Sequence, residues 1–314
     1  MQLYPLSFEP VYHEKLWGGR RLEGLFGRQL PPGLIGESWD IAAHPHGMSV
    51  VNNGPLRGMT LQDLADQYPQ ELYGTAVVPE RFPLLVKLID AQQALSVQVH
   101  PDNDYGAKHE NGEWGKTEAW YVVYAEPEAT IVYGLRPGLR KADFRRLVES
   151  GRTEEGLRKI SVQVGDVLHI PAGLVHALGA GVVVAEVQQN SDTVYRLYDW
   201  DRVDAAGQPR ELHIEKAFDV IHFELQPEPT RTTANPVVTN EFFIMEILQG
   251  REEALISDKE RFHILTCLSG TTSVRWRDHE VALTAGDSCL VPAACAGYTV
   301  QFDGRLLRAY PPTS

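Results

Sequence analysis

Side chains with metal-binding chemistry share one face of a short predicted strand about a third of the way along the chain. Ser96, Gln98 and His100 alternate with apolar residues. Because successive strand residues face opposite sides, these three side chains point the same way. Pro101 then ends the strand pairing, since it has no backbone N–H to donate to the ladder. An amide and an imidazole on one face could begin the coordination of a borderline divalent cation such as zinc.

A second strand-like run and a later histidine supply the other ligand types. In residues 116–122, Lys116 and Glu118 share one face. Residues 165–176 have the pattern of a turn, a strand, a Pro-Gly turn and a histidine that starts the next strand. A closed structural zinc site would be rich in Cys, whereas this set leaves room for water or substrate and predicts a catalytic metal. The predicted ligands are Gln98, His100, Glu118 and His176.

Each of these residues also has an ordinary structural interpretation. A histidine among valines is usually a hydrogen-bonded core or surface residue, and a strand glutamate is usually solvated. His109 and His169 keep this structural interpretation. Strand alternation places the His169 side chain on the opposite face from the one on which His176 begins the next strand. The conjunction of four ligand types with a Gly-Asp, Pro-Ala-Gly and His element is what favours a metal site.

Composition narrows the possible functions. The 314 residues are 43% hydrophobic, which is ordinary for a globular protein, and no apolar run approaches the length of a membrane span. A formal charge of −13 argues against nucleic acid, which binds basic surfaces. Residues 1–19 lack the basic and apolar regions of a secretory signal. Cys267, Cys289 and Cys295 form no CxxC pair and lie far from the predicted ligands, which is typical of a reducing, cytoplasmic location.

An anionic substrate would need a local cluster of cations in a chain of this net charge. The candidates for that cluster are Lys87, Lys116, Arg196 and Arg202. Cations on solvated faces are the ordinary alternative for each of them.

The chain is organised as short segments separated by Gly, Pro, Asn and Asp, which predicts a mainly β protein. Helical periodicity appears in residues 60–73, 141–149 and 210–223. Residues 226–236 are rich in Pro and Thr, lack periodicity and are interpreted as a linker. The predicted organisation is therefore a metal-binding unit over residues 1–225, this linker, and a C-terminal β unit over residues 237–314.

An internal repeat indicates that the two units share a fold. Residues 165–172, GDVLHIPA, align with residues 286–293, GDSCLVPA. The position of His176 is occupied by Gly297 in the second copy, so the C-terminal unit is expected to have no metal site. The Gln-x-His segment with its later Glu, and the element around residues 165–176, resemble the two motifs of the cupin β-barrel. The expected fold is mainly β, with two cupin-like (jelly-roll) β-barrel units and a few helices.

The metal motif, the repeat and the flanking segments together resemble type I phosphomannose isomerase (mannose-6-phosphate isomerase), in its short bacterial form. The resemblance covers nearly the whole chain. The segments that carry it are LWGG at 16–19, GESW at 36–39, PLLVK at 83–87, LSVQVHP at 95–101, GKTEAWY at 115–121, IPAG at 170–173 and YRLYDWDR at 195–202.

The resemblance implies a zinc enzyme, with one Zn²⁺ per chain, that interconverts mannose 6-phosphate and fructose 6-phosphate through a cis-enediol(ate). By motif, the four predicted ligands hold the metal and Arg196 is the active-site arginine. Lys87, Ser96 and Lys116 match positions that line the sugar-phosphate pocket, and Lys87 is expected to hold the phosphate. Glu186 and Asp192 match further polar positions of the pocket. The proton-transfer base is left open among Glu186, Asp192 and Lys116.

One departure from the family pattern concerns an insertion. Longer members carry a helical insertion between the two metal motifs, whereas only 57 residues separate Glu118 from His176 here. Any lid or phosphate contact from that insertion must come from elsewhere or be absent.

Alternative functions stay open at this stage. A non-catalytic double-cupin sugar-binding or sensor protein with a structural metal is one, although it would not need Arg196. Isomerisation of another phosphorylated aldose, or metal-dependent turnover of a different sugar, is another. The oligomeric state, the preferred epimer and the native metal are not determined, since imidazole and carboxylate also suit iron or manganese.

Overall fold

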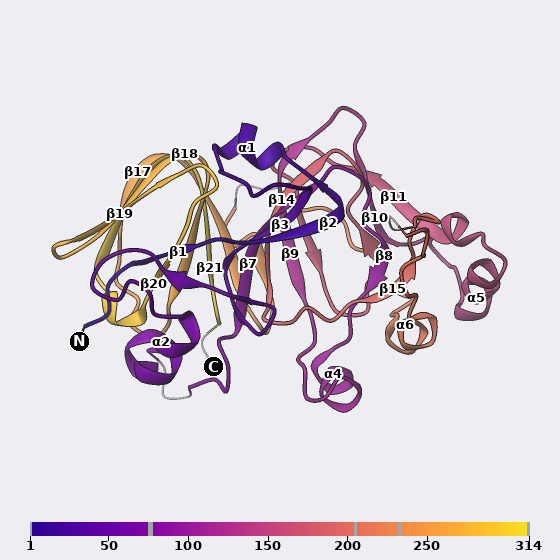
Figure 1. Cartoon of the computed structure of the whole chain (residues 1–314), viewed down its shortest axis with the longest axis horizontal. Coiled ribbons are helices and arrows are strands. Elements are labelled where there is room, and N and C mark those ends of the chain that lie inside the picture. The colour runs from indigo at the N-terminus through magenta and orange to yellow at the C-terminus, as the bar shows by residue number, and fades with distance from the viewer. Residues whose placement is uncertain (1, 75–77, 204–205, 232–233, 313–314) are drawn as a thin grey trace.

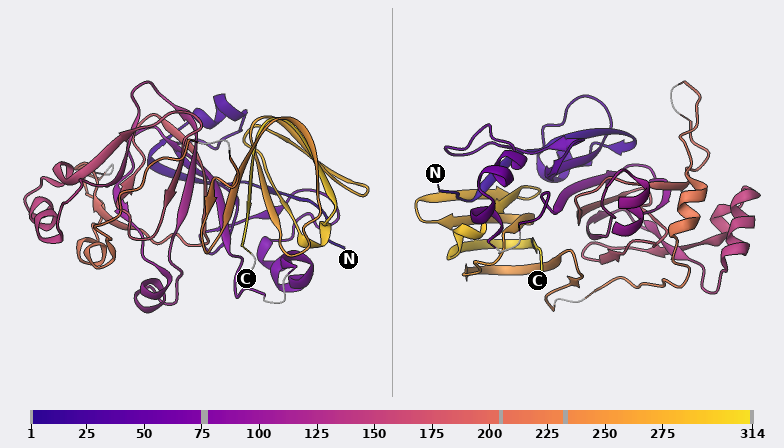
Figure 2. Two further views of the ribbon diagram at one scale, coloured as in Figure 1. Left: turned by 180° about the vertical axis from the view of Figure 1, so that it is seen from behind. Right: turned by 90° about the horizontal axis from the view of Figure 1, so that it is seen from below.

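A broad central sheet separates the two halves of the molecule (Figure 1). The computed structural model describes residues 2–74, 78–203, 206–231 and 234–312. In these residues three large antiparallel sheets and a small hairpin carry the fold, and helices cover its edges and ends (Figure 2).

The central sheet is buried on both faces. In β9, Trp120 and Val122 pack into the core toward the five-stranded sheet, whereas Ala119 and Tyr121 pack toward the C-terminal strands. Strands β7 and β14 are buried at every position, which explains their nearly continuous apolar sequence. In order across the sheet, the strands are β12 (Val167–Ile170), β9 (Glu118–Ala125), β14 (Val182–Gln189), β7 (Leu84–Ala91), β3 (Ile35–Ile41) and β2 (Val11–Gly19).

The five-stranded sheet packs its inner face against the central sheet. Its outer face is covered by α5 (Lys141–Glu149) and α6 (Ile214–Val220), and Val97 and Val99 of β8 belong to that outer core. Gln98 lies between these two valines and therefore points inward, as the alternation predicts. In order, the strands are β11 (Leu157–Ser161), β10 (Thr130–Leu135), β13 (His176–Ala177), β8 (Val97–Val99) and β15 (Tyr195–Tyr198).

The third sheet contains the C-terminal strands and two strands from the start of the chain. Strand β1 pairs with β20 through Leu6 and Leu290, so the first strand of the chain is part of the C-terminal sheet. Within the linker, Thr230 forms an isolated bridge to Val167. In order, the strands are β16 (Val238–Thr239), β17 (Ile244–Ile256), β21 (Tyr298–Tyr310), β18 (His263–Trp276), β20 (Ser288–Val291), β1 (Leu6–Glu9) and β6 (Val50–Val51), with β19 (His279–Thr284) paired to β18.

The sequence repeat corresponds to a repeated turn. Gly165 and Gly286 both have positive φ, 96° and 91°, which favours glycine. The carboxylates of Asp166 and Asp287 each accept a hydrogen bond from the backbone N–H three residues earlier, at 3.1 and 2.9 Å. A four-residue strand follows in both copies. The cupin-like, mainly β prediction is confirmed, but in the described ranges the sheets keep open edges and form sandwiches rather than closed barrels.

The predicted helices are confirmed in part. Residues 141–149 form α5 with the predicted bounds. Residues 60–73 form two helices, α2 (Leu61–Gln67) and α3 (Pro69–Tyr73), because Pro69 begins a new helix and has no N–H to continue the first. Thr60 caps α2 in a capping box with Asp63. The helix expected over residues 210–223 is shorter and spans only α6.

Several short elements were not predicted. They are α1 (Arg21–Phe26), α4 (Asn103–His109) and the hairpin of β4 (Ala43–His44) and β5 (Gly47–Met48). Asp102 caps α4 by accepting a hydrogen bond from the Tyr105 N–H at 2.8 Å. All three cysteines are buried and unpaired. No helix in the described ranges has both the length and the apolar character needed to span a membrane.

Candidate metal centre and active-site cavity

The predicted ligands come together between the two facing sheets of the N-terminal half. Gln98 of β8 lies opposite His176 of β13 in the sheet register, and His100 directly follows β8. Glu118 is the first residue of β9 in the facing sheet. Ligand atoms of His100, Glu118 and His176 all lie within 4.8 Å of one another. Residues separated by up to 78 positions thus form one cluster.

The donor atoms of this cluster converge on a common point. Glu118 Oε2 lies 3.5 Å from His100 Nε2, and Glu118 Oε1 lies 3.4 Å from His176 Nε2. The Gln98 amide nitrogen lies 3.3 Å from His176 Nε2. A rotation of that amide by 180° would present its oxygen instead, which is the atom that could bind a cation.

Both imidazoles are oriented by carbonyl oxygens behind them. His100 Nδ1 lies 2.8 Å from the Thr193 carbonyl, and His176 Nδ1 lies 2.9 Å from the Leu174 carbonyl. Each Nδ1 therefore carries the proton, and each Nε2 presents its lone pair toward Glu118. Metal-binding histidines are commonly held in this way.

The electrostatics of the cluster favour a bound cation. Burial lowers the pKa of His100 well below its ordinary value and lowers that of His176 to about 4, so both rings are neutral. Burial, with the nearby charge of Glu186, raises the pKa of Glu118. Glu118 Oε1 has no hydrogen-bond partner among the described residues. Two neutral imidazoles, an amide and a buried carboxylate whose Oε1 lacks a hydrogen bond fit a borderline divalent metal.

A cavity of about 140 Å³ adjoins this cluster. The predicted ligand Gln98 lines the cavity, and so does Lys116, whose Nζ lies 3.3 Å from His100 Nε2 and 2.5 Å from Glu118 Oε2. Arg202, which was a candidate for the cationic cluster, does not line it. The other predicted site residues that do line it are Lys87, Ser96, Glu186, Asp192 and Arg196.

Lys87 and Glu186 form a buried charge network in the cavity wall. Lys87 Nζ lies 3.0 Å from Glu186 Oε1 and 3.5 Å from Glu37 Oε2. The Trp120 Nε1–H donates to Glu186 Oε2 at 2.6 Å. Burial would raise the pKa of Glu186, but Lys87 and Lys116 outweigh it and the pKa is lowered. The charge of Lys87 is thus already balanced by two carboxylates.

Arg196 differs from the other cations of the cavity. It lies opposite Gln98 in the register of β15 and β8. Its Nε donates to Ser96 Oγ at 3.3 Å and its Nη1 to the Glu211 carbonyl at 2.7 Å. In the described part of the chain it has no ion pair with a carboxylate. Its guanidinium charge is therefore available to a bound anion.

Several cavity residues were given no role from the sequence. Glu37 pairs with Lys15 at 3.1 Å as well as with Lys87. The centroid of the Trp39 ring lies 5.3 Å from Lys87 Nζ. Both belong to the GESW segment, which was noted without a function. Arg210 was expected to start a helix, but it precedes α6, lines the cavity and pairs with Asp199.

Comparison with known proteins agrees with this architecture. Residues 6–131 match the family described as phosphomannose isomerase type I, catalytic domain, and residues 232–311 match the mannose-6-phosphate isomerase cupin domain. A probable mannose-6-phosphate isomerase of Bacillus subtilis, GmuF, is 38% identical, and the match covers 98% of this chain and 99% of the relative. The chain belongs to the type I phosphomannose isomerase family.

Other family members support the same assignment. The mannose-6-phosphate isomerase of Streptococcus mutans is 38% identical, with 96% of each chain covered. The crystal structure of the mannose 6-phosphate isomerase from Bacillus subtilis has a TM-score of 0.89 and 36% identity, and the match covers 98% of this chain and 99% of that one. The phosphomannose isomerase fold thus extends over nearly the whole chain.

Proposed function

We propose that this protein is a zinc-dependent aldose–ketose isomerase that interconverts mannose 6-phosphate and fructose 6-phosphate. The observation that carries the proposal is the His100, Glu118 and His176 cluster at the end of a cation-lined cavity, in a chain of the phosphomannose isomerase family. One Zn²⁺ per chain, a phosphorylated hexose as the partner and a cytoplasmic location are parts of the same proposal.

The proposed reaction moves a proton between C1 and C2 of the open-chain sugar through a cis-enediol(ate). A divalent cation held by Gln98, His100, Glu118 and His176 would act as a Lewis acid toward the oxygen atoms on C1 and C2. Arg196 would stabilise the negative charge that develops on them, because its planar guanidinium stays charged and has no competing carboxylate.

Lys116 and Glu186 are the proposed groups for proton transfer. They lie 4.0 Å apart in the cavity wall, and Lys116 also contacts two of the ligands. Glu186 is held by Lys87 and Trp120, so its carboxylate has a defined position. A base fixed in this way could take the proton and return it on the same face of the enediol. Ser96 and Asp192 would bind sugar hydroxyls.

The function is tested by removing and restoring the metal. Chelator-treated protein should be folded but inactive, and one equivalent of zinc should restore formation of fructose 6-phosphate from mannose 6-phosphate. Iron and manganese should be tested in parallel, since the same ligands suit them. A folded, metal-loaded protein that binds mannose 6-phosphate without turning it over would instead support the sugar-binding or sensor alternative.

The enediol route has its own test. In deuterated water the abstracted proton exchanges with solvent on the base, so repeated turnovers place deuterium at C1 of fructose 6-phosphate, whereas a direct hydride shift places none. The Glu186→Gln variant should lose both turnover and exchange, because the amide cannot accept the proton. An active enzyme that gives no deuterium incorporation even after many turnovers at equilibrium would contradict the enediol route while leaving the isomerase assignment intact.

A further inference from the structure

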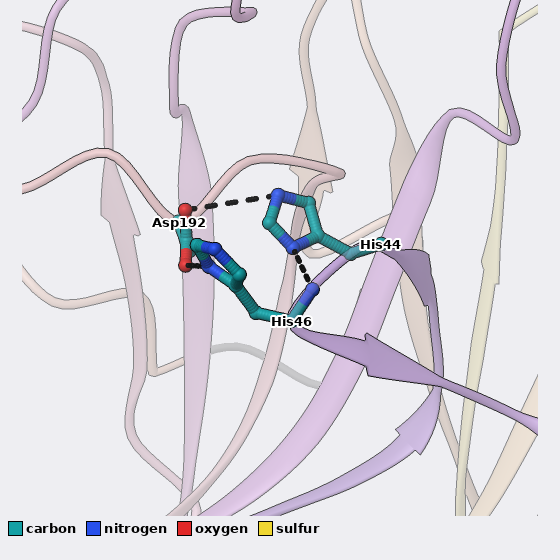
Figure 3. Close-up of side chains that lie close together, drawn as sticks. All are labelled: His44, His46 and Asp192. Atoms are coloured by element: carbon teal, nitrogen blue, oxygen red, sulfur yellow. Dashed lines mark hydrogen bonds and ion pairs between the residues drawn. The ribbon is translucent and has the colours of Figure 1, made fainter.

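A second group of metal-ligating side chains lies away from the buried centre. His44 and His46 lie on the hairpin of β4 and β5, and Asp192 lies on the loop between β14 and β15. Figure 3 shows the two rings and the carboxylate facing one another. Their ligand atoms all lie within 4.8 Å of one another. This group, the rim cluster, shares no residue with the buried centre.

One nitrogen of the rim cluster is buried without a hydrogen-bond partner. The His44 side chain is only 4% exposed, and its Nε2 has no hydrogen bond to any described residue. That atom lies 3.7 Å from Asp192 Oδ1 and 4.0 Å from Glu113 Oε2. A buried polar atom without a hydrogen bond lowers the stability of the folded state. This nitrogen points at two carboxylates that could share a cation with it.

The other members are positioned to complete a site and to admit an ion. His46 Nδ1 contacts Asp192 Oδ2, and the His46 side chain is 68% exposed. Arg81 holds Glu113 through Oε1 at 2.9 Å, which leaves Oε2 on the side of His44. Two imidazoles and one or two carboxylates are a ligand set for borderline divalent cations.

The loop and the hairpin that carry these ligands are tied together. Asn190, which is buried, donates through Nδ2 to the Ala43 carbonyl at 2.8 Å and to the Phe82 carbonyl at 2.9 Å. Asp192 follows two residues later and His44 follows Ala43 directly. The ligands are therefore held near each other by the buried backbone, independently of any ion.

We propose that His44, His46 and Asp192, with the carboxylate of Glu113 as an adjacent fourth ligand, form a second site for a borderline divalent cation such as Zn²⁺, Ni²⁺ or Co²⁺. The His46 N–H donates to His44 Nδ1 at 3.2 Å, so Nε2 carries the ring proton before the ion binds. When the ion binds, His44 Nε2 loses its proton to water and His44 Nδ1 takes a proton from water. The 3.2 Å hydrogen bond from the His46 N–H to His44 Nδ1 is then broken. Because Asp192 also lines the cavity, the ion would lie beside it.

The test is the metal content of tag-free protein, equilibrated with Zn²⁺ at low micromolar free concentration and measured by mass spectrometry. The wild type should bind two equivalents. His46→Ala should bind one, His100→Ala should bind one, and the double variant none. His109→Ala is the matched control, since it removes another exposed histidine and should leave two equivalents. With Co²⁺, the difference spectrum between wild type and His46→Ala should show ligand-field bands of the rim site.

The proposal fails if His46→Ala binds as much metal as the wild type, whether the wild type binds one equivalent or two. It fails equally if His109→Ala loses the second equivalent as His46→Ala does, because the ion is then bound adventitiously to surface imidazoles. Glu113→Gln should weaken the second site without abolishing it, and a melting curve for each variant confirms that it is folded. These outcomes do not depend on the isomerase activity, so they are separate from the test of the proposed function.

Discussion

Substitution of Arg196 by alanine separates the catalytic interpretation of this residue from a structural one. If the guanidinium stabilises the developing enediolate, its charge acts mainly in the transition state, and kcat should fall far more than KM rises. Loss of one such donor typically costs on the order of 10²–10³ in rate, or about 3–4 kcal/mol of barrier. Arg196→Lys should recover part of the rate, because it keeps the charge but loses the planar fork.

The expected loss of stability is much smaller. Arg196 makes two hydrogen bonds, to Ser96 Oγ and the Glu211 carbonyl, each contributing about 1 kcal/mol. A structural role would require a salt bridge from Arg196 to a carboxylate such as that of Asp199. Asp199 instead pairs with Arg202 and Arg210. The melting temperature should therefore fall by only about 2–8 °C.

Arg202→Ala is the matched control for this experiment. Arg202 pairs with Asp199 and donates to the Ala94 carbonyl at 2.7 Å, but it does not line the cavity. It should lower the melting temperature at least as much as Arg196→Ala and change kcat little. Steady-state kinetics in both directions, alongside melting curves, measure both quantities. A folded Arg196→Ala enzyme with near-normal kcat would refute the proposed mechanism.

Three further predictions address the metal, the buried lysine and the C-terminal unit. His100→Ala should lose metal from the buried centre together with activity, whereas His109→Ala should keep both; metal analysis and kinetics on the two variants decide this. Lys87→Met should lower the free energy of unfolding by about 3–5 kcal/mol, because the buried Glu186 loses its nearest counter-charge and Glu37 keeps only Lys15; a KM defect that shrinks with unphosphorylated mannose in a stable variant would instead indicate a phosphate anchor. Burial lowers the pKa of His263 to about 4, so the unfolded chain binds a proton first, and stability should fall as the pH falls from about 6.5 to 4 by up to about 3 kcal/mol. Urea titrations should show a weaker pH dependence in His263→Gln over that window, and an unchanged slope would contradict the assignment.

Local features of the fold could be predicted because they depend on neighbouring residues. The alternation around Gln98 predicted which side chains share a face, since strand geometry sets that parity whatever the sheet. The repeated Gly-Asp turn predicted a shared local structure, because glycine at positive φ and the aspartate hydrogen bond both act within four residues. The helix over residues 141–149 was found for the same reason.

The predictions of secondary structure were wrong where distant contacts or a single residue outweighed the local residue periodicity. Pro69 divides the helix expected over residues 60–73, and the segment from Arg210 contributes a cavity residue before α6 begins. Strand β1 pairs with β20 although 282 positions separate the paired residues Ser7 and Cys289. No periodicity in a single segment records such a partner.

For this protein, the sequence by itself determined the candidate ligand types, the strand face predicted for each and the family to which the chain belongs. The tertiary structure alone decided which cations remain free. Lys87 and Arg196 look alike as isolated basic residues, but burial between Glu37 and Glu186 neutralises one, while the other faces the cavity without a carboxylate. The rim cluster was also invisible in the sequence, because His44 and Asp192 meet only through the packing of a hairpin against a loop. Charge compensation depends on three-dimensional distance, and strand parity does not encode it.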